Sequence, residues 1–185
     1  GASLSAIGFG GMRFENQDDI GLSASLVTSA YEAGINYFDT APLYGKSEDI
    51  FGAAFKSMLK TRSQKPFFVS TKTFKSKPAE IRADLERSLQ RMGLEHVDFF
   101  HMWNISSLED YRERKKNGAL DEFQKLKSEG LVRHVCASTH MTGEDISVML
   151  DDHPFESVLL GFSAMNFPYR ERGVIAAKKK GVGVM

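Results

Sequence analysis

The sequence predicts a parallel α/β fold of the (β/α)8 TIM-barrel type, present as an incomplete barrel of about six βα units plus the start of strand seven. Apolar, strand-like runs alternate with helix-periodic segments along the chain, which indicates a parallel sheet with helices outside it. Strand ends recur every ~20–40 residues, the size of a βα unit. Because an eight-fold barrel typically needs ~250 residues, we expect residues 1–185 to form a single barrel domain truncated at its C-terminus.

A doubly wound sheet is the competing architecture. Such a sheet usually carries a dinucleotide-binding loop after its first strand, with the pattern Gly-x-Gly-x-x-Gly. The corresponding residues, Gly8-Phe9-Gly10-Gly11, do not match this pattern, and no helix begins directly after them. The barrel is therefore the better prediction.

Each element of the first half has its own signal. The apolar strand over 4–9 runs into a Gly-Gly pair, and the helix over 23–33 stops at Gly34, a C-terminal cap. A short strand follows over 36–38. Ser47 then supplies a hydroxyl cap for a helix over 48–59, with acidic residues in its first turn. The strand over 66–71 is continuously apolar and β-branched, as in a strand that is covered on both faces.

The second half continues the alternation. Pro78 stands near the first position of a helix over 79–92, which ends at Gly93, and a buried strand follows over 97–102. The polar, Arg- and Lys-rich stretch over 104–117 is predicted to be a long loop or a loose helix. A helix over 119–128 and a strand over 132–138 come next, and Thr142 caps a helix over 143–150. After Pro154 we expect a strand over 158–163, a helix over 174–180 and the start of a strand over 182–185.

Composition excludes several functional classes. Lys and Arg together number 24, as do Asp and Glu, so bulk charge favours neither a nucleic-acid partner nor a membrane surface. No apolar run approaches the ~18 residues of a membrane span, and the first residues do not resemble a signal peptide. Cys136 is the only cysteine, which excludes an internal disulfide and favours a reducing, cytoplasmic setting. Its spacing to the histidines matches no zinc pattern, so no metal site is expected.

Four polar side chains are expected at the ends of consecutive strands. Asp39 ends the second strand, Tyr44 lies in the loop after it, Lys72 ends the third strand and His101 stands near the end of the fourth. In a barrel the carboxyl ends of the strands share one face, so these groups are predicted to converge there. Lys72 follows a buried run, where an unpaired ammonium is costly, and is expected to pair with Asp39.

This set of groups suits the reduction of a carbonyl compound. A lysine beside a tyrosine is expected to lower the pKa of the phenol, so Tyr44 is predicted to donate a proton to a developing alkoxide near neutral pH. A neutral His101 is expected to donate a hydrogen bond to the same oxygen, and a nicotinamide would supply the hydride. The simpler alternative is that Asp39 and Tyr44 only stabilise a turn.

The same stretches resemble a known family. Residues 34–41 (GINYFDTA), with Tyr44-Gly45 and Ser47-Glu48, resemble the signature of the aldo-keto reductase superfamily. Residues 70–72 resemble its lysine strand, 98–101 its histidine strand and 129–133 its approach to the fifth strand. The resemblance covers almost the whole chain in order. Residues 126–130 and 138–140 lean toward a microbial branch of predicted oxidoreductases, some with an appended iron–sulfur region.

The resemblance implies a (β/α)8 barrel and NADPH-linked reduction of a small-molecule aldehyde or ketone. It implies that Tyr44 is the proton donor, that Asp39 and Lys72 tune it, and that His101 orients the carbonyl group. The residues that it places at the cofactor are Gly11 and Met12 near the nicotinamide ribose, Asp39, and Ser138 and Thr139 near the carboxamide.

Departures from the family pattern limit these expectations. Leu159 stands where the family often has Gln, and Thr139 where Asn is usual. The resemblance places the aromatic that stacks on the nicotinamide, and the main phosphate-binding segment, beyond Met185. We therefore expect the 185-residue chain to bind NADPH poorly. The carbonyl substrate, the choice between NADPH and NADH and the oligomeric state stay open, and the alternative is a regulatory or binding subunit without useful turnover.

Overall fold

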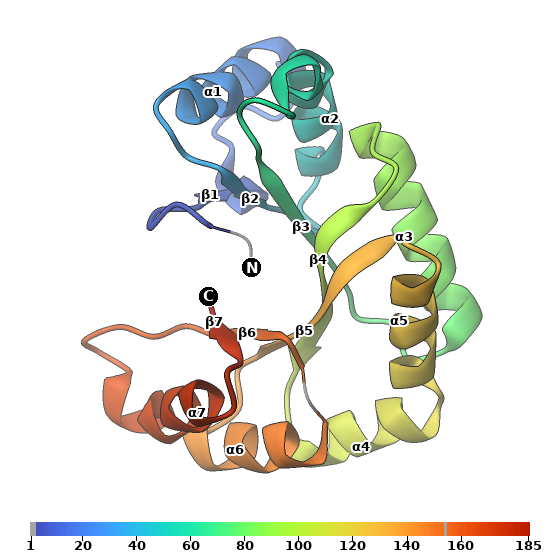
Figure 1. The fold of residues 1–185 in the computed structure, drawn as a ribbon, viewed down its shortest axis with the longest axis vertical. Helices are drawn as coiled ribbons and strands as arrows, with labels where there is room; N and C mark the ends of the chain where they lie inside the picture. Colours follow the sequence, from blue (N-terminus) through green and yellow to red (C-terminus); the bar gives the residue numbers. More distant parts are fainter. Residues whose placement is uncertain (1–2, 154) are drawn as a thin grey trace. The chain divides into compact units, whose positions relative to one another are not determined.

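The computed structural model describes residues 3–153 and 155–185, so Pro154 lies outside the described residues. Strands and helices alternate along the described chain (Figure 1). The strands are β1 (Phe9–Gly10), β2 (Tyr37–Asp39), β3 (Phe68–Thr73), β4 (Val97–Ile105), β5 (Val132–Thr139), β6 (Ser157–Leu159) and β7 (Gly183–Val184). The α-helices are α1 (Ile20–Glu32), α2 (Ser47–Met58), α3 (Pro78–Met92), α4 (Leu108–Lys116), α5 (Ala119–Ser128), α6 (Gly143–Asp152) and α7 (Phe167–Lys179), and short 3-10 helices cover Gly11–Arg13 and Leu59–Thr61.

The strand order confirms the predicted fold class. The strands of the described chain form one seven-stranded sheet in the order β1-β2-β3-β4-β5-β6-β7. The pairs β1–β2, β2–β3, β5–β6 and β6–β7 are parallel. Each strand thus pairs with the next one in the chain, whereas a doubly wound sheet reverses its order at a switch point. The fold is that of an incomplete (β/α)8 barrel.

Several sequence predictions differ from the structure. The strand predicted over 4–9 is only Phe9–Gly10, and the strand predicted over 158–163 is Ser157–Leu159. The stretch over 104–117, predicted to be a long loop or a loose helix, contains a regular helix, α4, which the Ser107 hydroxyl caps by accepting a hydrogen bond from the Asp110 amide. Helix α7 begins at Phe167, seven residues earlier than predicted, with a proline in its first turn. Ser47 does not cap α2, because its side chain is buried and its hydroxyl is bound to the Thr40 hydroxyl instead.

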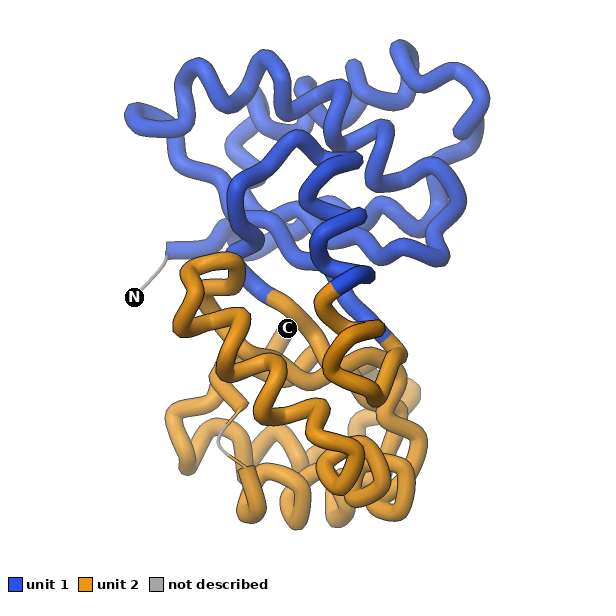
Figure 2. Tube along the Cα trace, turned by 90° about the vertical axis from the view of Figure 1, so that its right-hand side faces the viewer, with its two compact units in different colours: residues 1–73, 83–99 blue, residues 74–82, 100–185 orange. Residues whose placement is uncertain are grey.

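The described chain divides into two compact units (Figure 2). The first comprises residues 1–73 and 83–99, and the second comprises residues 74–82 and 100–185. The boundaries fall at the end of β3, inside α3 and inside β4. That residues 1–185 act as a single domain stays a prediction.

The core of the first unit is a cluster of phenylalanines. Phe38 on β2 contacts Phe51 and Phe55 on α2 and Phe67 before β3, with ring centroids 6.0–6.1 Å apart. All four side chains are at most 1% exposed. Each contributes about 1.5–3 kcal/mol through burial, so this cluster fixes α2 against β2. Asp39 ends β2, and Tyr44 lies in the middle of the segment between β2 and α2.

The helices of the second unit are closely packed. Helices α6 and α7 lie side by side (Figure 1), and a Cβ at Gly143 would stand 2.9 Å from the backbone nitrogen of Gly173. Phe100 on β4 stacks on Phe123 of α5 with 4.8 Å between ring centroids. In neither unit is any helix of the described residues long and apolar enough to span a bilayer.

Candidate functional site

The first unit contains a buried ion pair at the ends of two neighbouring strands. Asp39 ends β2 and lies opposite Ser70 of β3, and Lys72 is two residues further along β3 on the same face. The Lys72 Nζ lies 2.6 Å from both carboxylate oxygens of Asp39 and 2.8 Å from the carbonyl oxygen of Thr40. The predicted pairing of Lys72 with Asp39 is therefore present.

This geometry stabilises an ammonium group that is shielded from water. The Lys72 side chain is 1% exposed, whereas the Asp39 side chain is 20% exposed. An ammonium has three N–H donors, and Lys72 has one acceptor for each of them. Ser70 also donates its hydroxyl proton to Asp39 Oδ1, at 2.5 Å. Removing one partner of such a pair would cost about 3–5 kcal/mol, because the other charge would be left buried.

Tyr44 lies against this pair. Its ring is half-buried, and the Lys72 Nζ stands 5.1 Å from the ring centroid, a cation–π distance. Hydrogen bonds from the Tyr44 amide to the Ala41 carbonyl, at 3.0 Å, and from the Ser47 amide to the Tyr44 carbonyl, at 3.1 Å, shape the loop. The structure thus brings together three of the predicted site residues.

The pKa of Tyr44 differs from the sequence expectation. Burial raises the pKa of this phenol to about 12, and the negative charge of Asp39 adds to the shift. The pKa is raised although the Lys72 ammonium lies nearby, because much of the ammonium charge is offset by the Asp39 carboxylate at 2.6 Å. Burial lowers the pKa of Lys72, and Asp39 opposes that shift. The phenol is therefore fully protonated at neutral pH, as a proton donor must be.

The loop between β2 and α2 has a second anchor, which the sequence predictions missed. The hydroxyls of Thr40 and Ser47 are 2.7 Å apart, and both residues are 0% exposed. Next to Ser47, Glu48 is 2% exposed and accepts hydrogen bonds from Thr71, at 3.0 Å, and Arg91, at 3.1 Å. Ser47 and Glu48 belong to the stretch that resembles the family signature, which was the available signal for both.

His101 belongs to the second unit and is fully buried on β4. Its Nδ1 lies 3.3 Å from the carbonyl oxygen of Ala137 on β5, which can only accept, so Nδ1 carries a proton in this bond. Hydrogen-bond donation by a neutral His101 and its convergence with Tyr44 both stay predictions.

Ser138 and Thr139 end β5 in the same unit as His101. The Thr139 hydroxyl donates to the Ile105 carbonyl, at 2.7 Å, and accepts from the Met141 amide, at 3.0 Å. The Thr139 hydroxyl is thus engaged in hydrogen bonds with the backbone at the end of β4 and after β5. Ser138 is 7% exposed. Of the two, Ser138 fits a contact to a carboxamide better.

Gly11 and Met12 follow β1 in the first unit. A Cβ on Gly11 would collide with the Ser47 hydroxyl and the Phe51 ring, so the glycine permits close packing on α2. Met12 is 51% exposed, and a Cβ on Gly10 would meet no atom within 4 Å. Open space and exposed side chains at the end of β1, together with the partly exposed Asp39 carboxylate, fit a ribose that carries hydroxyl groups.

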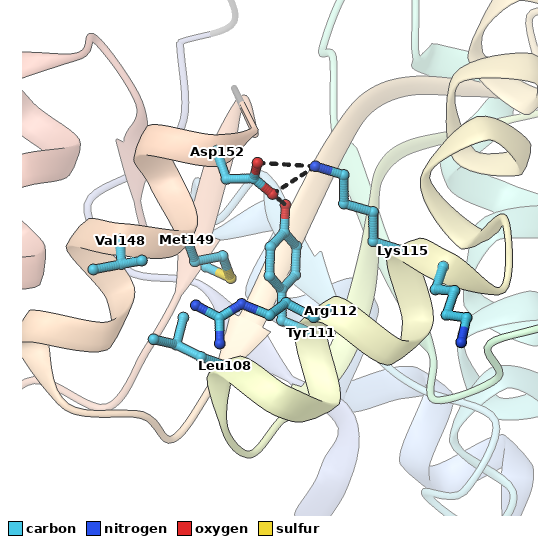
Figure 3. A pocket seen from close by; sticks show the side chains of 8 residues that line it. Leu108, Tyr111, Arg112, Lys115, Val148, Met149 and Asp152 are labelled. Carbon is cyan, nitrogen blue, oxygen red and sulfur yellow. Dashed lines mark hydrogen bonds and ion pairs between the residues drawn. The ribbon is translucent and has the colours of Figure 1, made fainter.

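The described cavities lie elsewhere in the chain. One of about 480 Å³ lies between α4 and α6, where Tyr111 and Lys115 both point to Asp152 (Figure 3). The Tyr111 hydroxyl and the Lys115 Nζ each lie 2.8 Å from Asp152 Oδ2. The Asp152 carboxylate is therefore paired with the Lys115 ammonium and also accepts a hydrogen bond from Tyr111. A second cavity of about 550 Å³ is lined by residues of 134–182. None of the predicted site residues lines either cavity, and the described residues contain no group of three potential metal ligands.

Comparisons with known proteins agree with this architecture. The model of the Aldo/keto reductase family matches residues 6–185. The L-galactose dehydrogenase of Arabidopsis thaliana is 29% identical over 211 aligned residues, which cover 100% of the chain and 61% of that protein. The chain therefore spans about three fifths of the length of this relative.

Two solved structures share the fold. An aldo-keto reductase of Bacillus halodurans in its holo form is 24% identical, with a TM-score of 0.75, and the match covers 98% of the chain and 61% of that protein. An aldo-keto reductase of Bombyx mori in complex with NADP is 21% identical, with a TM-score of 0.74, and the match covers 97% and 61%.

Proposed function

Because the chain belongs to the aldo/keto reductase family, whose members are oxidoreductases that use NAD(P)H, we propose that it contains the proton donor of an NADPH-dependent carbonyl reductase. The reaction would reduce an aldehyde or ketone to an alcohol. The observation that supports it best is the Lys72–Asp39 pair packed against the half-buried ring of Tyr44. A tyrosine that only stabilised a turn would not need a buried ammonium beside it.

In this proposal Tyr44 is the general acid. Its phenol is protonated at neutral pH, and it would donate that proton to the carbonyl oxygen as negative charge develops there. The Lys72 ammonium, 5.1 Å from the ring centroid, would then favour the phenolate that is left behind. Bound NADPH would supply the hydride to the carbonyl carbon. The carbonyl compound gains a hydride and a proton, and the cofactor is oxidised.

Several side chains are proposed to hold the cofactor and the substrate. Asp39 would accept a hydrogen bond from a ribose hydroxyl, Gly11 and Met12 would border that ribose, and Ser138 would contact the carboxamide. His101 would orient the carbonyl oxygen through a hydrogen bond donated by its ring. The complex of the Bombyx mori relative with NADP supports the choice of cofactor.

The relatives also guide the choice of substrates and conditions. The Arabidopsis protein is named for the dehydrogenation of a sugar, so sugars and the oxidative direction belong in the test. We propose a small-molecule carbonyl compound or alcohol as the substrate, with no nucleic-acid or membrane partner. A cytoplasmic location is proposed because Cys136 is the only cysteine.

The test is NADPH oxidation by the full-length protein with a panel of aldehydes, ketones and sugars. Tyr44→Phe should lower kcat by about 10²–10⁴-fold, the usual contribution of a general acid. An unchanged rate in Tyr44→Phe would remove Tyr44 from the mechanism. NADPH binding without turnover of any substrate would favour the alternative, a regulatory or binding subunit.

A further inference from the structure

We propose that Thr40 and Ser47 are positioning residues that set the place of Tyr44 by closing its loop with a buried hydroxyl–hydroxyl hydrogen bond. This inference rests on the proposed function, because it assigns a role to residues around the same tyrosine. Thr40 directly follows Asp39 on β2, and Ser47 begins α2. Tyr44 lies between them, so any change in the distance between Thr40 and Ser47 changes the shape of the loop that carries it.

The bond between the two hydroxyls has an ordinary length and is fully shielded from water. Thr40 Oγ1 and Ser47 Oγ are 2.7 Å apart, and both residues are 0% exposed. A buried hydroxyl without a partner is costly, so each of the two holds the other in place. A Cβ on Gly11 would collide with Ser47 Oγ, which leaves that hydroxyl little room to turn elsewhere.

The pair is also coupled directly to the charged groups of the site. The Thr40 carbonyl accepts a hydrogen bond from Lys72 Nζ at 2.8 Å, and the Thr40 amide donates to the Ser70 carbonyl at 2.9 Å. These two bonds fix the start of the loop relative to Lys72 and to strand β3. The bond from Thr40 to Ser47 then fixes the end of the loop relative to its start, and Tyr44 is held near Lys72 as a result.

The outer side of the loop is held by a weaker contact. The Gln17 side chain accepts a hydrogen bond from the Lys46 amide, at 2.6 Å, and occupies the space where a Cβ of Gly45 would stand. Gly45 has φ +62°, a left-handed conformation that favours glycine. This contact is exposed, so water can replace Gln17. Of these two side-chain contacts, the buried Thr40–Ser47 bond is therefore the stronger constraint on the loop.

Kinetics of the full-length protein test the inference. Thr40→Val keeps the shape of the side chain but removes the hydroxyl, and it should lower kcat by about 10–100-fold, the effect of a small misplacement of a reacting group. KM should change little, because neither hydroxyl is assigned to substrate. Thr40→Ser restores the hydroxyl and should recover most of kcat. Ser57→Ala, on the same helix α2, removes a hydroxyl that donates to the Ala54 carbonyl, away from the loop, and should leave kcat unchanged.

A second readout separates positioning from simple stabilisation. The ionisation of Tyr44 can be followed in the cofactor-free protein by tyrosinate absorbance, as the difference from Tyr44→Phe. A loosened loop exposes the ring to water, so Thr40→Val should lower the pKa of Tyr44 toward its ordinary value. If Thr40→Val does not fold, Ser47→Ala removes the same bond from the other side.

The outcomes distinguish this inference from the proposed function. Wild-type kcat and wild-type Tyr44 ionisation in Thr40→Val, even with a lower melting temperature, would overturn the positioning role. Full activity in Tyr44→Phe would overturn the proposed function instead. In that case the Tyr44 titration in Thr40→Val would still decide whether the Thr40–Ser47 pair sets the environment of the ring.

Discussion

At the scale of single residues, the Lys72 ammonium is a positive charge held in a fixed position. It is held by two carboxylate oxygens and one carbonyl oxygen within 2.8 Å, and it faces the ring of Tyr44. The ammonium offsets the negative charge of Asp39, which by itself raises the pKa of the phenol. Its removal should therefore affect the tyrosine as well as the carboxylate.

Lys72→Met is expected to abolish most of the proposed reductase activity, with kcat lower by about 10²-fold or more. The variant leaves Asp39 without its partner, so the pKa of Tyr44 should rise further. Steady-state NADPH oxidation and the Tyr44 titration measure the two effects. Lys115→Met, which breaks an exposed ion pair with Asp152, is the matched control and should change kcat little. Wild-type kcat in Lys72→Met would contradict the assigned role.

The raised pKa of Tyr44 predicts a pH effect on stability. Its folded value is about 12, above the ordinary value of 10.0, so the folded state keeps a proton that the unfolded state loses. This contribution to stability is fully present below pH 10 and is lost as the pH rises toward 12. Chemical denaturation should show a larger alkaline loss of stability in the wild type than in Tyr44→Phe over this range. Parallel curves for the two proteins would argue that the ring is solvated.

Cys136 is expected to be chemically inert in the folded protein. It is 0% exposed, and burial raises the pKa of its thiol to about 12. Because the thiolate is the reactive species, iodoacetamide at neutral pH should modify Cys136 only after unfolding, as mass spectrometry can show. Rapid modification under native conditions would place Cys136 at an accessible surface.

At the scale of elements, close helix packing depends on single glycines. Gly52 of α2 faces α3, and a Cβ there would collide with the Arg91 carbonyl oxygen and stand 3.1 Å from Met92 Cα. Gly52→Ala should therefore destabilise the protein by about 1–3 kcal/mol, although alanine favours helix formation. Gly21→Ala in α1, where the nearest atom is 3.6 Å away, is the control and should not destabilise. Denaturant midpoints compare the two, and equal midpoints would show that α3 can shift.

Most elements could be predicted because their signals are local. Helices α3 and α5 match their predicted ranges within one residue, since Pro78 and the glycines after each helix act through their own backbone geometry. Thr142 caps α6 as expected, with its hydroxyl 3.1 Å from the Asp145 amide. Ser47 carried the same signal but bonds to Thr40, seven residues earlier. A hydroxyl beside a helix start can serve either purpose, and only the folded chain decides.

At the scale of the whole molecule, the chain spans 61% of the length of its Arabidopsis relative. The family resemblance places the main phosphate-binding segment in the remainder. The 185-residue chain is therefore expected to bind NADPH at least about 10-fold more weakly than the full-length protein, the effect of losing a charged contact. Fluorescence titration of both forms measures this difference. Equal affinities would mean that residues 1–185 hold the cofactor by themselves.

The candidate site was predictable only in part. Asp39 and Lys72 could be paired from the sequence because parallel strands align their carboxyl ends and a buried ammonium needs a carboxylate. The direction of the pKa shift of Tyr44 could not be predicted, because it depends on how fully Asp39 offsets the charge of Lys72 and on how deeply the ring is buried. The tautomer of His101 likewise depends on the Ala137 carbonyl of the next strand.

The saturation of Lys72 by three acceptors has a consequence for the return of the catalytic proton. With its N–H bonds engaged by Asp39 and Thr40, Lys72 has none to pass along a relay to Tyr44. The side chain can only exert an electric field on the phenol. In the proposed mechanism, the Tyr44 hydroxyl would then regain its proton from water rather than from Lys72.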